Sequence, residues 1–241
     1  MSIPRLMAAL LIFILALLLA CSLLAEGGGR TSPLLHALEL REYGGESLSS
    51  IADLDMPSIG EIQYIDRDDY RLTIGGCVTA PRSYTYSEVV DNFTAHGAIA
   101  PIYLMDGRNA TIYWEGVLVA DLIQAAGQRD GANTVIFHAR DGYSTSLPLA
   151  YIIENDIIMA YRANGVTLPA DLGFPFILVA KGKWGYKWIR WITFIEVSDN
   201  DGYRGYWESR GCSNEGDVEV GNGTLCRADD RDADPPAGGI S

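Results

Sequence analysis

The most chemically suggestive segment of the chain is a short basic and aromatic run at residues 181–191, KGKWGYKWIRW. It holds all three lysines and three of the five tryptophans, although the 241-residue chain has a formal net charge of −13. Cations gathered among flat rings and two glycines can hold an anionic or planar group. The same pattern also fits an ordinary strand with aromatic side chains packed inward and cations solvated outward. Both interpretations stay open on these residues alone.

The charge balance of the rest of the chain excludes some function classes. No second basic cluster accompanies residues 181–190, which argues against nucleic acid as a partner. The acidic excess also disfavours anionic lipid headgroups. An apolar content of 48% is ample for a core, and the length fits one domain with terminal extensions.

The N-terminus has the features of an export signal. Arg5 precedes an uninterrupted stretch of apolar and small residues, 6–25. Residues 18–21, LLAC, resemble the lipobox of prokaryotic lipoproteins, which predicts lipidation of Cys21. About 20 apolar residues could instead span a bilayer without cleavage. Both alternatives predict an extracytoplasmic domain anchored to a membrane.

The remaining cysteines indicate little redox or metal chemistry. Outside the cytoplasm, the local spacing of Cys212 and Cys226 allows a disulfide. Cys77 is then left over in a strand-like segment, where we expect a buried, inert thiol. No Cys/His spacing resembles a zinc site.

Composition divides the chain into four parts. A Gly- and Ser-rich region follows the anchor, a denser region has turn and strand signals, and the end is acidic and poor in apolar residues. We expect a lipoprotein signal or membrane anchor at 1–25, a flexible linker at 26–62, a folded domain at 63–214 and an acidic disordered tail at 215–241.

Strand signals dominate the folded region, with a few short helices between them. A Thr-x-x-Glu capping box predicts a helix at 85–93, and helical spacing followed by Gly127 predicts another at 118–126. These elements predict an α+β domain with a mixed sheet. A further short helix is expected at 148–154, and strands at 70–78, 99–104, 110–117, 134–139, 157–161, 174–180 and 187–197.

Seven segments between about residues 64 and 214 resemble, in order and spacing, the sulfite-oxidase-type molybdopterin-binding domain. The resemblance is to small exported members that consist of the cofactor domain alone. It implies the α+β fold with a mixed sheet, and it implies molybdopterin as the cofactor. The segments are YRLTIGG from residue 70, YWEGVLVADLI from 113, FHARDGYSTSLPL from 137, AYRANGVTLP from 160, GFPFILV from 173, WGYKWIRWI from 184 and GYWESRG from 205.

The resemblance gives the basic run a role. In this family, the glycine-rich basic segment and the strand after it offer backbone amides and a cation to the phosphate of the pterin cofactor. Such donors suit a phosphate dianion. The family loop that borders the pterin pocket has its counterpart here in residues 141–145. The cofactor-binding residues implied for this chain are Tyr143, Ser144, Lys187, Trp188, Ile189 and Arg190.

One departure from the family pattern concerns the metal. The family holds molybdenum with a cysteine thiolate that follows a strand, about ten residues before its Trp-Glu-Gly-Val motif, and alignment on that motif places Leu104 there. An alkyl side chain cannot ligate molybdenum. Strand alternation predicts that Met105 points to the opposite face, and Asp106 lies in the following turn. Cys77 is distant in sequence, so no catalytic or metal-ligating residue is predicted.

Two further positions have lost polarity. Leu172 and Ile177 stand where the family usually has polar residues that help to hold the cofactor. The sequence therefore favours a degenerate, membrane-tethered member without molybdenum redox catalysis, which binds a pterin-phosphate-like ligand. One alternative is an active molybdopterin-dependent oxidoreductase acting on a small oxyanion or sulfoxide. Another is a cell-surface interaction module that uses a Trp/Tyr-rich face.

Overall fold

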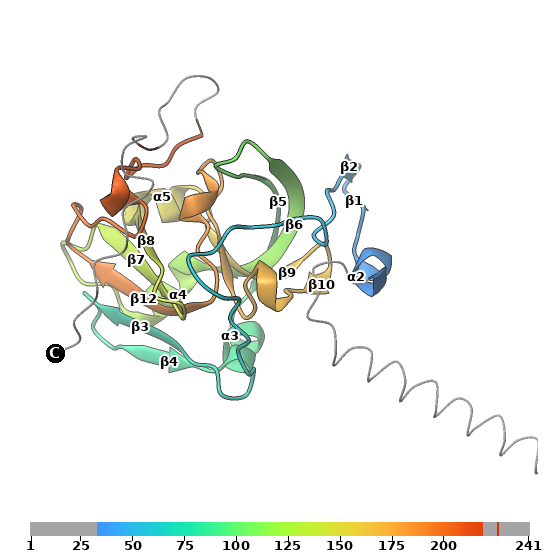
Figure 1. The fold of residues 1–241 in the computed structure, drawn as a ribbon. Coiled ribbons are helices and arrows are strands. Elements are labelled where there is room, and N and C mark those ends of the chain that lie inside the picture. Colours follow the sequence, from blue (N-terminus) through green and yellow to red (C-terminus); the bar gives the residue numbers. More distant parts are fainter. Residues whose placement is uncertain (1–32, 219–225, 227–241) are drawn as a thin grey trace, which may run out of the picture.

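The computed structural model describes residues 33–218 and residue 226 (Figure 1). The predicted signal or membrane anchor at residues 1–25, the lipidation of Cys21, and residues 219–225 and 227–241 of the predicted tail lie outside the described residues. Within the described part of the chain, no helix is both long and apolar enough to cross a bilayer.

One of the two five-stranded sheets is antiparallel, with β9 in its middle and the β5–β6 hairpin at its edge. A turn joins β5 to β6, and its Gly107 adopts a φ of 89°, which favours glycine. Alternate side chains of β6 are buried, as expected for a sheet with one face on the core. The strands are β5 (Ala95–Tyr103), β6 (Asn109–Leu118), β9 (Ile158–Ala163), β10 (Val166–Thr167) and β11 (Ile177–Val179).

The second sheet has the order β4-β3-β12-β7-β8. Its β3 and β12 run parallel, whereas the other pairs are antiparallel, so the sheet is mixed. This confirms the predicted α+β class with a mixed sheet. The strands are β3 (Leu72–Gly76), β4 (Arg82–Tyr84), β7 (Thr134–Ala139), β8 (Ser144–Pro148) and β12 (Ile192–Ser198).

The short helices begin and end where local sequence signals place them. Thr85 and Glu88 form both hydrogen bonds of the capping box at the start of α3 (Tyr86–Asn92). Gly127 ends α4 (Val119–Ala126) in the left-handed conformation. The other helical elements are α5 (Leu149–Glu154) and the 3₁₀ helices η1 (Ala170–Leu172), η2 (Gly185–Lys187) and η3 (Glu208–Arg210).

The predicted flexible linker at 26–62 is wrong from residue 33 onward. This region forms α2 (Pro33–Leu38) and a small hairpin, β1 (Glu42–Tyr43) with β2 (Glu46–Ser47), and then crosses the front of the domain (Figure 1). The buried Glu39 carboxylate fixes it, because it accepts hydrogen bonds from the Ser50 hydroxyl, the Ile51 amide and Asn164. The last of these donors lies 125 residues away in sequence, and composition carries no sign of such a partner.

The prediction of a disordered tail from residue 215 is wrong for residues 215–218. The Trp184 amide donates to the Gly216 carbonyl over 2.8 Å, and Lys183 pairs with Asp217. The expected disulfide between Cys212 and Cys226 is present. Residues 212–218 therefore pack against the basic run. Their acidic side chains favour exposure to solvent, but main-chain hydrogen bonds to the basic run hold these residues in place.

Candidate functional site

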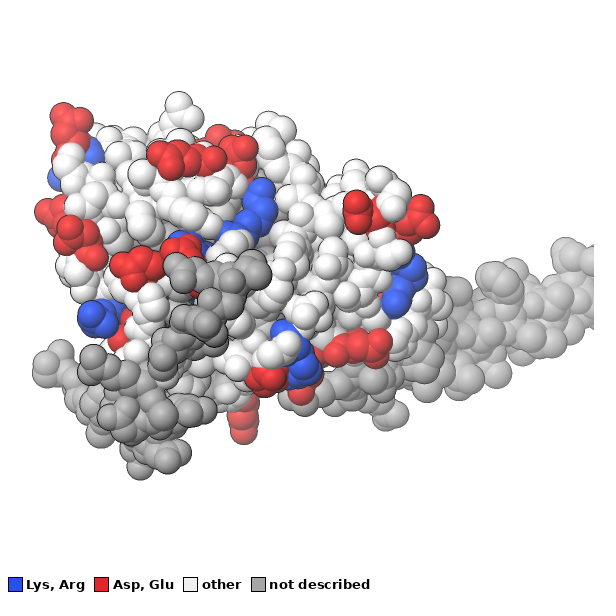
Figure 2. Space-filling model, turned by 90° about the horizontal axis from the view of Figure 1, so that it is seen from above, with Lys and Arg blue, Asp and Glu red and all other residues white. Residues whose placement is uncertain are grey.

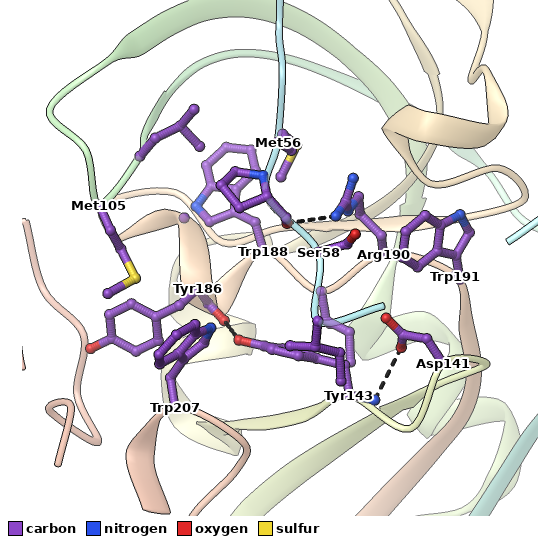
Figure 3. Close-up of a pocket in the computed structure, with 15 residues that line it drawn as sticks. Met56, Ser58, Met105, Asp141, Tyr143, Tyr186, Trp188, Arg190, Trp191 and Trp207 are labelled. Carbon is purple, nitrogen blue, oxygen red and sulfur yellow. Dashed lines mark hydrogen bonds between the residues drawn. The ribbon is translucent and has the colours of Figure 1, made fainter. Parts of the chain in front are cut away.

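A cavity lies where the β5–β6 turn of one sheet meets the β7–β8 turn of the other (Figure 3). It encloses about 660 Å³, counting the part open to solvent. The walls are mostly aromatic and aliphatic. They consist of residues 56–59, Leu104, Met105, Asp141, Tyr143, residues 185–191 without Lys187, and Trp207.

The predicted cofactor-binding residues divide into two groups. Tyr143, Trp188, Ile189 and Arg190 line the cavity, whereas Ser144 and Lys187 do not. The Ser144 hydroxyl instead accepts a hydrogen bond from the Tyr203 hydroxyl over 2.8 Å. The sequence thus identified the segment that forms the wall, but it did not identify which side chains of the segment face the cavity.

Lys187 is fully buried beside the cavity rather than in it. Its Nζ donates to Glu208 Oε1 over 2.5 Å and to the Ser146 carbonyl over 3.0 Å, and the Thr145 hydroxyl donates to the same carboxylate oxygen. Burial lowers the pKa of Lys187, and Glu208 opposes that shift. We call Lys187, Glu208, Thr145 and Ser146 the lysine cluster. Its cation is already neutralised by a carboxylate.

The strand predicted to begin at Lys187 begins instead at Ile192. Residues 185–187 form η2, where the Lys187 amide donates to the Trp184 carbonyl over 2.9 Å and the Trp188 amide to the Gly185 carbonyl over 3.0 Å. Trp191 then adopts a φ of 54° before β12 starts. Strand periodicity could not indicate this tight 3₁₀ turn.

Arg190 is the cation of the cavity wall. Its guanidinium donates to the Asp171 carbonyl over 2.5 Å and to the Pro57 carbonyl over 2.6 Å, and it stacks 4.4 Å from the Trp191 ring. Burial lowers the pKa of Arg190 to about 10, while Asp141 and Asp171 favour its charged form. Its contact with Pro57 ties down residues 55–59, which we call the strap.

Tyr143 and Asp141 come from the turn between β7 and β8. Asp141 Oδ1 accepts the Tyr143 amide over 3.0 Å, which shapes the turn. The Tyr143 hydroxyl donates to the Tyr186 carbonyl, joining two walls of the cavity (Figure 3). Burial raises the pKa of Tyr143 well above its ordinary value, so this phenol is a hydrogen-bond donor and not a base at neutral pH.

Leu104 and Met105 both line the cavity, so the prediction that Met105 faces away is wrong. Strand alternation does not apply, because β5 ends at Tyr103 and a turn follows. Leu104 is 3% exposed, and its amide donates to the Arg108 carbonyl. Asp106 is bound by Arg108 and does not line the cavity.

The donor chemistry of the wall does not suit a metal that needs an anionic sulfur ligand. Cys77, the free cysteine among the described residues, follows β3 and does not line the cavity. Among the residues that the structure describes, no three His, Cys, Asp or Glu side chains group as a metal site. Leu172 and Ile177, the two positions that lost polarity, are buried in the core and also do not reach the cavity.

Several residues of the cavity carried no signal in the sequence. The strap comes from the presumed linker, and Trp207 is not among the predicted cofactor-binding residues. Trp188 and Trp191 are 2% and 1% exposed, so they do not form the aromatic surface of an interaction module. On the described part of the face shown in Figure 2, Lys and Arg side chains are scattered among acidic ones.

The family model described as "Oxidoreductase molybdopterin binding domain" matches residues 59–207. The uncharacterized oxidoreductase YuiH of Bacillus subtilis is 28% identical over 160 residues, which cover 66% of this chain and 80% of that protein. Mitochondrial sulfite oxidase of Mus musculus is 32% identical over 114 residues, 43% of this chain and 21% of that one. The crystal structure of the sulfane dehydrogenase SoxCD from Paracoccus pantotrophus superposes with a TM-score of 0.55. It has 22% identity and covers 57% of this chain and 40% of that one.

Proposed function

This chain belongs to the oxidoreductase molybdopterin-binding domain family, and from that premise we propose that it is a degenerate, membrane-tethered member. In this proposal it keeps the cofactor fold and a cavity for a pterin-like ligand outside the cytoplasm. It does not carry out molybdenum redox catalysis. Molybdenum, where relatives hold it, supplies the electron-transfer step, and no such step is assigned to this chain.

The observation that carries the proposal is the side chain at position 104. Leu104 lines the cavity at the position where the family resemblance requires a thiolate. Its neighbour Met105 offers a thioether, which carries no anionic charge. Because molybdenum in this family is held by a sulfur anion, the wall does not fit the metal centre.

The organic part of the cofactor is a better match. Trp188, Trp207 and Tyr143 offer flat rings along the cavity wall. Stacking and apolar contact with such rings bind planar heterocycles. These residues would hold a pterin-like ligand whether or not a metal is attached to it.

Three features support the tether and the compartment. The apolar stretch at residues 6–25 and Cys21 precede the described domain closely. Three exposed leucines, Leu34, Leu38 and Leu40, follow within the first described residues, as suits a surface near lipid. The Cys212–Cys226 disulfide fits an oxidising compartment.

The proposal is tested by restoring the missing thiolate. The full chain and its Leu104→Cys variant are produced in a host that makes and inserts molybdopterin, and metal content is measured by mass spectrometry. We expect molybdenum well below stoichiometric in the parent and a clear gain in the variant. Tyr64→Cys is the matched control, since Tyr64 is 76% exposed and lies outside the cavity wall.

Stoichiometric molybdenum in the parent protein would contradict this proposal and favour the second candidate function. That candidate is an active molybdopterin-dependent oxidoreductase acting on a small oxyanion or sulfoxide. The names of the relatives favour it, since the similar proteins of Bacillus and mouse are an oxidoreductase and a sulfite oxidase.

A further inference from the structure

We propose that the cavity takes an uncharged, planar heteroaromatic ligand without a phosphate group, anchored by hydrogen bonds that its edge donates to Asp141. This inference rests on the proposed function, because it assumes that the cavity binds a pterin-like ring. It goes further by naming the chemical class of the ligand. It also departs from the family resemblance, which implies a phosphate-bearing cofactor.

The lysines of the basic run are not available to a phosphate in the cavity. The Lys187 ammonium is fully buried and pairs with Glu208 over 2.5 Å. The Lys183 side chain is 5% exposed, and its ammonium pairs with Asp217. Neither residue lines the cavity, and neither does Lys181. Releasing Lys187 would leave the buried Glu208 carboxylate without its counter-ion, which is strongly unfavourable.

Three backbone amides in the middle of the run are also occupied. A phosphate cradle needs several N–H groups that point into a concave loop. The Trp184 amide donates to Gly216, and the Lys187 and Trp188 amides donate to carbonyls within η2. These N–H groups therefore satisfy the protein's own acceptors rather than face the cavity.

Arg190, the one cation on the described wall, is already balanced. Both of its terminal nitrogens donate to backbone carbonyls. Asp141, Asp171 and Asp55 all act on its charge, and two of these three also line the small pocket on the other side of Arg190. A phosphate monoester carries a charge of about −1.5 to −2 near neutral pH. It would enter a region where Asp141, Asp171 and Asp55 already favour the charged form of this one guanidinium, and repulsion from their carboxylates would oppose binding.

The rest of the wall suits an uncharged ring. Trp188, Trp207 and Tyr143 present aromatic rings, and Leu104 and Ile189 add aliphatic surface. The sole carboxylate of this wall is Asp141, which uses Oδ1 to accept the Tyr143 amide. Its other oxygen can accept from a ring edge that carries adjacent N–H donors, such as the amino and ring N–H groups of a pterin.

Binding of two matched probes tests the inference. Neopterin and neopterin monophosphate are titrated into the full chain in detergent, with tryptophan fluorescence and calorimetry as readouts. We expect the phosphate ester to bind at least about tenfold more weakly than neopterin. Equal or tighter binding of the ester would overturn the inference but leave the proposed function standing. If neither probe binds, the inference and the pterin-binding part of the proposed function both fail.

A variant of Asp141 gives a second, independent test. Asp141→Asn keeps an oxygen acceptor for the Tyr143 amide, so the turn is expected to remain folded, but it removes the charged acceptor. We expect about a tenfold loss of neopterin affinity. The affinities of neopterin and its monophosphate should also differ less in the variant than in the parent. Asp130→Asn, at an exposed position outside the cavity wall, is the control. Unchanged affinity in Asp141→Asn would overturn the assignment of Asp141 as the anchor.

Discussion

Lys187 and Arg190 lie three residues apart in one basic run, yet the fold uses them in opposite ways. Lys187 is enclosed in the lysine cluster, where Glu208 neutralises it. Arg190 lies on the wall of the cavity and donates to two uncharged carbonyls, one of them in the strap. The first cation is part of the core, and the second is part of a site.

The difference shows how little a cation in a sequence reveals about its task. Both residues have the charge that the family resemblance associates with phosphate. A buried cation needs a partner, and whether that partner is a carboxylate of the protein or a ligand depends on what the fold places next to it. Here η3 brings Glu208 to Lys187, which was not evident from the chain.

The largest expected effect comes from removing the cation of the lysine cluster. Lys187→Ala leaves the Glu208 carboxylate buried without a counter-ion, so we expect the free energy of unfolding to fall by about 3–5 kcal/mol. Chemical denaturation measures this value. Lys181→Ala, in the same run but outside the cluster, should change the free energy of unfolding by about 0.5 kcal/mol or less. Equal effects of the two substitutions would contradict the role of Lys187 as a core residue that neutralises the buried Glu208 carboxylate.

A more local effect is expected at the cavity wall. Arg190→Met removes the hydrogen bonds to the Asp171 and Pro57 carbonyls, and the second of these joins the cavity wall to the strap. We expect faster hydrogen exchange in the strap, with residues 39–51 unchanged because Glu39 fixes them. Hydrogen-exchange mass spectrometry separates the two segments. A loss of protection across the whole domain would mean that Arg190 is a core residue like Lys187.

The smallest effect concerns Tyr143, which connects the cavity to Tyr186. Tyr143→Phe removes one hydrogen bond, so near neutral pH we expect a loss of about 1 kcal/mol in the free energy of unfolding. The pKa of Tyr143 is raised in the folded protein, so the folded state holds its proton above the ordinary value of 10.0 while the unfolded state releases it. Stability contributed by this phenol is therefore present below pH 10 and is lost as the pH rises beyond it.

The comparison of wild type and Tyr143→Phe should therefore change with pH. We expect their difference in free energy of unfolding to shrink above about pH 10, by at most about 1.4 kcal/mol per pH unit. Urea denaturation at a series of alkaline pH values gives this difference directly. Tyr64→Phe, at an exposed position, is the control. A difference that stays constant to pH 11.5 would show that Tyr143 is not shielded from solvent as described.

Much of the fold could be predicted because its signals are local. The capping box at Thr85, Gly127 after α4 and the turn at Gly107 fix where chain segments begin and end. The strand β7 was predicted with the bounds that the structure has. The ordered structure of residues 33–62, part of the presumed linker, could not be predicted. Its stabilising contacts join Glu39 and Ser49 to residues more than 60 positions away.

The sequence by itself determined the mixed-sheet fold, the family and the aliphatic residue at position 104, since these follow from local pattern and motif order. Only the tertiary structure decided which cation faces the cavity, that the strap forms one of its walls, and that Met105 lies beside Leu104. The reason is physical. The availability of a charge or a side chain depends on the partners that distant segments bring to it, and burial makes the choice of partner energetically decisive.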